Sequence, residues 1–219
     1  AHFDLDGHEL MISRTGFTGD LGYELWIAPE AALTLWDGLM EAGHNHAIAP
    51  VGAHALDITR IEAGFLQPGV DFQSAEYVLR HTRGRSPFDM GLDWLVDFNK
   101  GHFNGRRALL KEKQANNHRF CFVGLDIEGN KPAHGAILYH KQKKEVGHIT
   151  SAAWSPTLKA NVALALLRRP YGESIAEDLW LEIYVDKELK WERVMARARI
   201  VPRPFFKPRR RGLTPPENF

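Results

Sequence analysis

The run FCFVGLDI, residues 120–127, opens the stretch of the chain that decides its fold. It is followed by further short runs rich in β-branched and large apolar residues, namely GAILYH, KEVGHITSAAW, VALALL, LWLEIYV and WERVMARARIV. Turn-forming sequences such as Glu128-Gly129-Asn130 lie between them. Short strands at this spacing are typical of a small antiparallel barrel or sandwich, and we predict a barrel over residues 116–206.

The residues before this stretch mix strand and helix signals. Strand-like runs occur around Glu9–Arg14 and Gly22–Ile27, and the residues on either side of an Asp6-Gly7 turn predict a hairpin. Pro29 opens PEAALTLWDGLMEAG, in which apolar residues recur at helical spacing. A second helix is predicted from Ala53 to Ala63, ended by Gly64.

We therefore predict an α+β fold in which a mixed α/β portion precedes the small antiparallel barrel. The boundary is expected in LLKEKQANNHR, residues 109–119, which is polar and rich in Lys, Gln and Asn. The predicted division is a partial α+β region over 1–115, the barrel over 116–206 and a basic tail over 207–219.

Composition excludes several function classes. The 219 residues carry a net charge of +1, so no global electrostatic attraction to nucleic acid is expected, and the locally basic KPRRRGL (207–213) reads as solvated. The single cysteine, Cys121, excludes an internal disulfide framework or a zinc site built on cysteines. The sequence contains neither a membrane-length apolar run nor a secretion signal, and we expect a cytoplasmic protein without a membrane partner.

Motifs for metal or nucleophilic catalysis are missing from the sequence. The eleven histidines are scattered and form no His-Glu-x-x-His pattern, so no metal site is predicted. There is no G-x-S-x-G elbow, and Cys121 lies in an apolar strand-like run.

The stretch ISRTGFTGDLGYELW, residues 12–26, combines three glycines with a carboxylate. Gly16, Gly19 and Gly22 match neither the phosphate loop nor the dinucleotide fingerprint, and we interpret them as a tight turn with positive φ. Glu24 shares one strand face with Trp26. A carboxylate in this position is either exposed to solvent or an acceptor for a ligand.

Charged residues also occur within the second predicted helix. Asp57 and Arg60 lie three residues apart and can pair on the helix surface. If Arg60 instead points inward, its permanent charge indicates an anionic or heteroaromatic ligand or a structural carboxylate.

Four stretches, in this order, resemble the glycine-cleavage T-protein (aminomethyltransferase) superfamily. They are SRTGFTGDLGYEL (13–25), ALDITRIEAGF (55–65), SPFDMGLDWLVDFNKGHFNGRRAL (86–109) and EVGHITSAAWSPTLKANVALALL (145–167). The resemblance implies a tetrahydrofolate-dependent transferase that takes a one-carbon unit from a small-molecule methyl or aminomethyl donor.

The resemblance also implies roles for individual residues. Glu24 falls where the family places a carboxylate against the pterin ring, and Arg60 falls at an arginine close to the folate. Tyr23 and Trp94 lie in segments that approach the ligand. The family's catalytic aspartate belongs to an amino-terminal domain outside this chain, so the chain is expected to be a carboxy-terminal portion, and its catalytic residue is unknown.

The sequences LGYELW and EAGFLQPGVDF depart from those usual in the T-protein and resemble the demethylase-like branch of the family more closely. The iron–sulfur assembly branch carries a cysteine where NKGHFNGR has His102, which counts against that branch. Three alternatives stay open: the aminomethyltransferase of glycine cleavage with its carrier protein, a non-catalytic folate-binding module, and an accessory domain of a flavin-linked amine oxidase.

Overall fold

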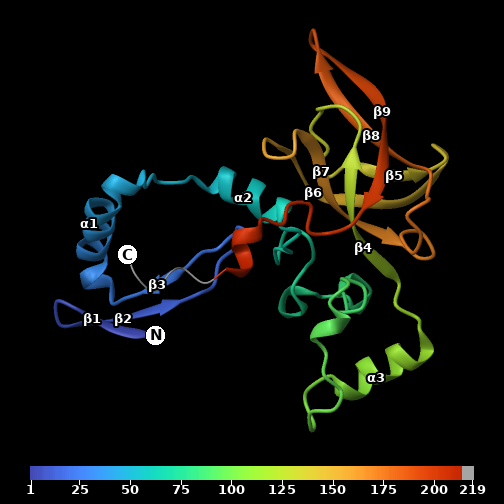
Figure 1. Cartoon of the computed structure of the whole chain (residues 1–219). Coiled ribbons are helices and arrows are strands. Elements are labelled where there is room, and N and C mark those ends of the chain that lie inside the picture. The colour runs from blue at the N-terminus through green and yellow to red at the C-terminus, as the bar shows by residue number, and fades with distance from the viewer. Residues whose placement is uncertain (214–219) are drawn as a thin grey trace. The chain divides into compact units, whose positions relative to one another are not determined.

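The computed structural model describes residues 1–213, except for the side chain of residue 81. The described chain divides into two compact units, one made of residues 1–60 and 207–213 and the other of residues 61–206 (Figure 1). Helices and sheets are both present, so the predicted α+β class is confirmed. The predicted boundary near residue 115 stays a prediction, and residues 214–219 of the predicted basic tail lie outside the described residues.

The first unit contains a three-stranded antiparallel sheet in the order β1-β2-β3. The hairpin turn between β1 and β2 is the predicted Asp6-Gly7 pair, both at positive φ (51° and 82°), as a tight two-residue hairpin turn requires. The predicted strands are confirmed, although the third is only three residues long. The bounds are β1 His2–Leu5, β2 His8–Ser13 and β3 Glu24–Trp26.

The predicted helices of this unit are also confirmed. A single 3-10 turn, η1 (Pro29–Ala31), leads into α1 (Ala32–Gly43), and the apolar residues of α1 fall on one side of the helix. A second 3-10 turn, η2 (His44–His46), follows. Helix α2 runs over Ala53–Glu62, one residue short of its predicted end.

The link between α2 and the barrel contains more helix than the sequence suggested. It carries three 3-10 turns, η3 (Ala75–Tyr77), η4 (His81–Arg83) and η5 (Asp93–Leu95), and the helix α3 (Arg106–Ala115). Most of the polar stretch at 109–119 is therefore helical rather than an irregular linker. The physical reason is that its Leu, Lys, Glu, Gln and Ala residues are good helix formers, and Asn116 ends the helix at a φ of 47°.

The second unit is dominated by a closed barrel with the strand order β4-β7-β6-β5-β8-β9, as predicted. All neighbouring strands are antiparallel. Gly147 lies on β6 where the chain passes very close to β7, because a Cβ at this residue would stand 2.2 Å from the carbonyl oxygen of Leu166. The bounds are β4 Phe120–Ile127, β5 Ile137–His140, β6 Lys144–Ser155, β7 Ala160–Arg168, β8 Leu179–Lys187 and β9 Lys190–Val201.

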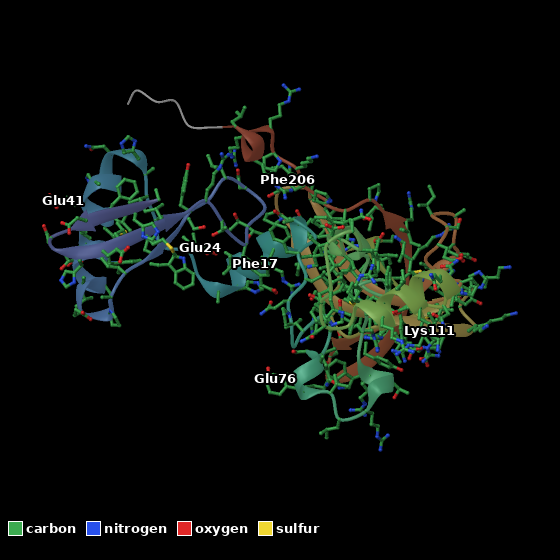
Figure 2. All side chains as sticks on the ribbon, turned by 90° about the horizontal axis from the view of Figure 1, so that it is seen from below. Phe17, Glu24, Glu41, Glu76, Lys111 and Phe206 are labelled. Carbon is green, nitrogen blue, oxygen red and sulfur yellow. The ribbon has the colours of Figure 1, made fainter. Side chains whose placement is uncertain are left out.

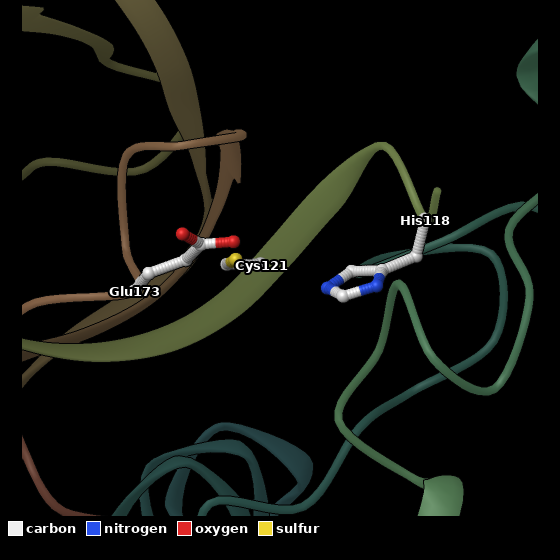
Figure 3. Close-up of side chains that lie close together, drawn as sticks. All are labelled: His118, Cys121 and Glu173. Carbon is white, nitrogen blue, oxygen red and sulfur yellow. The ribbon is translucent and has the colours of Figure 1, made fainter. Parts of the chain in front are cut away.

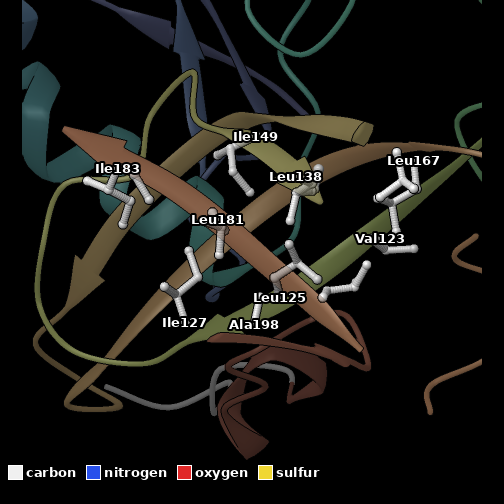
Figure 4. Close-up of a cluster of buried hydrophobic side chains, with 14 residues drawn as sticks. Val123, Leu125, Ile127, Leu138, Ile149, Leu167, Leu181, Ile183 and Ala198 are labelled. Atoms are coloured by element: carbon white, nitrogen blue, oxygen red, sulfur yellow. The ribbon is translucent and has the colours of Figure 1, made fainter. Parts of the chain in front are cut away.

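The barrel encloses the main hydrophobic core (Figure 4). Alternate residues of each strand point inward, so the strands contribute apolar side chains from all around the barrel. Buried members include Leu125, Leu138, Val146, Ile149, Leu167, Leu179 and Leu181, all with 1% exposure or less. A second apolar cluster packs Ile61, Met90 and Phe122 against Val162, Leu164 and Leu166.

Buried carboxylates connect the last residue of α2 and the segment after it to the barrel. Asp71 accepts hydrogen bonds from the hydroxyls of Thr150 (2.5 Å) and Ser151 (2.7 Å). Glu62 accepts one from the hydroxyl of Ser155 (2.5 Å). Because each charge has nearby donors, its burial is compensated, and these residues hold the link in place.

Candidate functional site

The glycine-rich segment forms the turn between β2 and β3. Gly19 is buried and has a φ of +75°, so the predicted positive φ is confirmed at this residue. The prediction is wrong for Gly16 and Gly22, which are not in the left-handed region. Gly16 and Gly22 bring the two ends of the turn together, because a Cβ on Gly16 would lie 3.9 Å from the Cα of Gly22. The turn therefore returns the chain directly to β3, where Glu24 is the first residue.

Glu24 lies exposed on one face of the sheet (Figure 2). Its register partner on β2 is Ser13, and the partner of Trp26 on the same face is Met11. Trp26 is 57% exposed, so an aromatic ring stands two residues from the carboxylate on the same side of the strand. The sequence left open whether Glu24 is exposed to solvent or accepts hydrogen bonds from a ligand. In the structure, which contains no ligand, its carboxylate is exposed to solvent.

The Glu24 carboxylate has both oxygens available. Within residues 1–213, its side chain forms no hydrogen bond or ion pair with another side chain. A charged carboxylate can accept up to four hydrogen bonds and is suited to a ligand edge with two parallel N–H donors. The exposed Trp26 ring beside it offers a flat apolar surface.

Arg60 is almost completely buried, with 1% of its surface exposed. Its Nε donates a hydrogen bond of 2.8 Å to Asp57 Oδ1, so the predicted pair three residues apart on the helix is confirmed. The Asp57 side chain is 45% exposed. Arg60 is thus a buried guanidinium near the end of α2. From the sequence, the pair with Asp57 and the burial of Arg60 were alternatives, and the structure shows both.

The remaining two predicted site residues are surface aromatics. Tyr23 is 45% exposed and directly precedes Glu24, so it points to the opposite side of the chain. Trp94 is 75% exposed in η5 and belongs to the other unit. Tyr23 and Glu24 are therefore adjacent in the chain, and Arg60 lies in the same unit. Trp94 does not.

The pair formed by Asp20 and Arg210 was not anticipated from the sequence. The Asp20 carboxylate in the glycine turn accepts hydrogen bonds from the Arg210 guanidinium, with Nε 2.9 Å from Oδ1 and 2.8 Å from Oδ2. These bonds hold the pKa of the Asp20 carboxyl below its ordinary value. Opposite charge was the only signal in the sequence, and 190 residues separate the partners. Although the 207–213 segment is largely exposed, as expected of a solvated tail, Arg210 is ion-paired.

A second cluster gathers His118, Cys121 and Glu173 in the other unit (Figure 3). One potential ligand atom from each lies within 4.8 Å of the others, which is a spacing that invites a metal. However, the Arg169 guanidinium pairs with Glu173 and lies 3.3 Å from His118 Nδ1.

Arg169 makes this cluster a poor cation site. A guanidinium can only donate, so in its contact with Arg169 the Nδ1 atom of His118 is the acceptor, and the cationic guanidinium repels a metal ion there. Burial raises the pKa of the Cys121 thiol, which keeps it protonated. We interpret the cluster as a hydrogen-bonded ion pair that ties Glu173 to the link before β4.

Two family models match the chain. The model described as "GCVT N-terminal domain" matches residues 1–100, and the model described as "Glycine cleavage T-protein C-terminal barrel domain" matches residues 121–207. The second match coincides with the closed barrel. Among the described helices, none is both long enough and apolar enough to cross a membrane.

Curated proteins with two different names are similar to this chain in sequence. An aminomethyltransferase of Thermotoga neapolitana is 39% identical over 165 residues, covering 75% of this chain and 42% of the relative. A trimethylamine-oxide aldolase of Ruegeria pomeroyi is 37% identical over 164 residues, covering 74% of this chain and 19% of the relative. The chain therefore spans less than half the length of either protein.

A solved structure supports the fold. The crystal structure of glycine cleavage system aminomethyltransferase T from Bartonella henselae matches with a TM-score of 0.74 and 24% sequence identity. The match covers 90% of this chain and 50% of that chain. At this identity the likeness bears on the fold alone.

Proposed function

Because the chain belongs to the glycine-cleavage T-protein family, we propose that it takes part in tetrahydrofolate-dependent one-carbon transfer from a methylated small molecule. Relatives with 37–39% identity carry the names aminomethyltransferase and trimethylamine-oxide aldolase, both of which denote chemistry at a carbon attached to nitrogen. The whole reaction is proposed for the longer protein, since the chain spans only part of these relatives.

The observation that carries this proposal is the exposed Glu24 carboxylate, which has no side-chain partner within residues 1–213. The edge of a pterin ring presents an N–H and a neighbouring amino group, two parallel donors that one carboxylate accepts together. A charged acceptor with both oxygens available fits this edge. When bound, tetrahydrofolate would supply the N5 and N10 atoms that receive the carbon unit.

The other candidate residues support binding in different ways. The guanidinium of Arg60 would favour an anionic or electron-rich part of the cofactor. Its burial and its bond to Asp57 fix its position before any ligand arrives. Tyr23 and Trp94 offer exposed aromatic surface for stacking. We assign no catalytic acid or base to this chain.

The proposal is tested by titrating the full-length gene product with tetrahydrofolate in a calorimeter. Replacing Glu24 by Gln removes the charge and one acceptor, and we expect affinity to fall about 10- to 100-fold, because a hydrogen bond to a charged group contributes about 1.5–3 kcal/mol. Glu41→Gln is the matched control, since Glu41 is an exposed carboxylate on α1 in the same unit (Figure 2).

Equal affinity of the Glu24→Gln variant and the unmodified protein would remove Glu24 from the site. Equal losses in both variants would show that the effect reflects general charge and not the pterin edge. Absence of tetrahydrofolate binding by the unmodified protein would contradict the proposed function itself.

A second candidate is the aminomethyltransferase reaction of glycine cleavage. It is favoured by the 39% identity to a relative of that name. This reaction takes its carbon unit from a lipoylated carrier protein, whereas the demethylase-like reaction uses a free small molecule. Measuring formation of the folate product with and without the lipoylated carrier distinguishes the two, because only the aminomethyltransferase depends on the carrier.

A further inference from the structure

The segment after the barrel returns to the glycine turn of the first unit. The 3-10 turn η6 (Arg209–Gly212) carries Arg210, whose guanidinium binds both oxygens of Asp20. A second connection runs from Arg14 Nη2 to the backbone oxygen of Leu213, at 2.6 Å. Figure 1 shows this red segment beside the blue chain of the β2–β3 connection. Residues 207–213 thus contact both the beginning and the middle of the turn.

Asp20 also organises the turn from within. Its Oδ1 accepts a hydrogen bond from the backbone N–H of Leu21 (2.8 Å), and its own N–H donates to the Thr18 hydroxyl (3.4 Å). The neighbouring Gly19 is held in the left-handed region. One carboxylate therefore joins the local turn geometry to a guanidinium that lies far away in the sequence.

The position of this carboxylate matters because Tyr23 and Glu24 follow it by only three and four residues. No helix or long strand lies between them, since β3 begins at Glu24 itself. A shift of the turn is consequently transmitted to the start of β3. The apolar interior of the first unit is too small to fix the turn by packing, as Leu10 and Ala31 are its only buried apolar side chains among the described residues.

We propose that residues 207–213 form a strap whose Arg210, through Asp20, holds the glycine turn and positions Tyr23 and Glu24 for their ligand. Arg210 and Asp20 are positioning residues and do not themselves touch the ligand. The assignment of that ligand as tetrahydrofolate rests on the proposed function. The effect of Arg210 on the order of the turn does not rest on the proposed function. The strap and the identity of the ligand can therefore be tested separately.

The expected effect is local because the pair is near the surface. The Arg210 side chain is 67% exposed and that of Asp20 is 25% exposed, and exposed ion pairs contribute little to global stability. Two-point contact between guanidinium and carboxylate nevertheless fixes direction as well as distance. Breaking it should leave the protein folded and loosen mainly residues 16–24.

The first measurement is backbone amide hydrogen exchange over residues 16–24 without ligand. In Arg210→Ala and Asp20→Asn we expect exchange in this segment to be about 3- to 10-fold faster, because local opening becomes easier. Arg209→Ala is the matched control. It removes the same charge from the same turn, and Arg209 has no side-chain partner among the described residues.

The second measurement is tetrahydrofolate affinity of the same full-length variants. We expect a loss of about 3- to 10-fold for Arg210→Ala, no loss for Arg209→Ala, and partial recovery in Arg210→Lys, which keeps the charge but loses the two-point geometry. The exchanged pair Asp20→Arg with Arg210→Asp should recover affinity relative to either single change. This recovery would show that the ion pair itself, and not either side chain alone, supports binding.

Unchanged exchange at residues 16–24 in Arg210→Ala would overturn the strap. Faster exchange with unchanged affinity, in a protein in which Glu24→Gln does weaken binding, would overturn its positioning role. If the unmodified protein binds no tetrahydrofolate, the proposed function fails, and the exchange measurement alone decides whether the strap holds the turn.

Discussion

The two units of the chain are stabilised in different ways. The barrel unit buries about twenty apolar side chains, whereas the first unit buries only Leu10 and Ala31 among its described residues. Helix α1 illustrates the contrast, because it has an apolar side but no buried residue, and Leu33 on it is 77% exposed. Burial of apolar surface drives folding of the barrel, whereas the first unit has much less buried apolar surface to stabilise it.

The difference in buried apolar surface between the two units affects which of them tolerates the changes that form a binding site. A closed barrel with a dense core resists change at almost every inward position. The first unit exposes a carboxylate, aromatic rings and a glycine turn on short elements, which suits a surface that a ligand or a protein partner covers. We therefore expect mutations to act through stability in the barrel and through binding in the first unit.

The largest expected effect comes from a core deletion in the barrel. Leu181 on β8 is fully buried in the main core, so Leu181→Ala should lower the free energy of unfolding by about 2–5 kcal/mol. The matched change in the first unit is Leu33→Ala on α1, for which we expect less than about 0.5 kcal/mol. Urea denaturation followed by circular dichroism measures both. Similar losses would contradict the contrast between the units.

A pair of glycine substitutions should give effects of opposite sign. In Gly147→Ala the new Cβ would meet the Leu166 carbonyl oxygen, and β6 and β7 would have to move apart, at a cost of about 1–3 kcal/mol. Gly38 lies in α1 with open space around its Cβ position, so Gly38→Ala should stabilise the helix by about 0.5–1 kcal/mol. Thermal unfolding of the two variants provides the test, and a stabilising Gly147→Ala would show that the strands are less tightly packed than described.

The smallest expected effect concerns the titration of Asp20. Arg210 lowers the pKa of this carboxyl in the folded protein, so the pair contributes fully above the ordinary value of 3.8 and its contribution is lost as the pH falls through the lowered pKa. In Arg210→Ala the pKa should rise back toward its ordinary value. NMR titration of the Asp20 carboxyl carbon measures the shift, and an unchanged pKa would indicate that the ion pair does not form in solution.

The barrel was predictable because its signals are local. Alternating apolar residues in runs such as 120–127, separated by turns, specify strands with one face inward, and a series of them leaves few other arrangements. Helix α2 was predicted to within one residue because a glycine stops it at Gly64. Helix α3 was missed because polar residues without a buried face look like a linker, although their helix propensity is high.

The candidate site was less predictable. The sequence placed Glu24 and Trp26 on one face correctly, because strand alternation is a local rule. It could not decide whether Glu24 is exposed, since that depends on what packs over β3. The sequence also did not predict the ion pair between Asp20 and Arg210. The two residues are 190 positions apart, and contacts between such distant residues depend on the tertiary fold and leave no periodic pattern in the sequence. The roles of Glu24, Arg60, Tyr23 and Trp94 toward a ligand stay predictions.

The closure of the barrel has a practical consequence for handling the protein. A sheet that closes on itself has no free strand edge, whereas the three-stranded sheet ends at β1 and β3. Open edges present unpaired backbone groups that can recruit strands from other molecules. When the chain is produced by itself, aggregation should therefore begin at the β1 and β3 edges, and a charged or proline substitution on the outer side of β1 is the place to improve solubility.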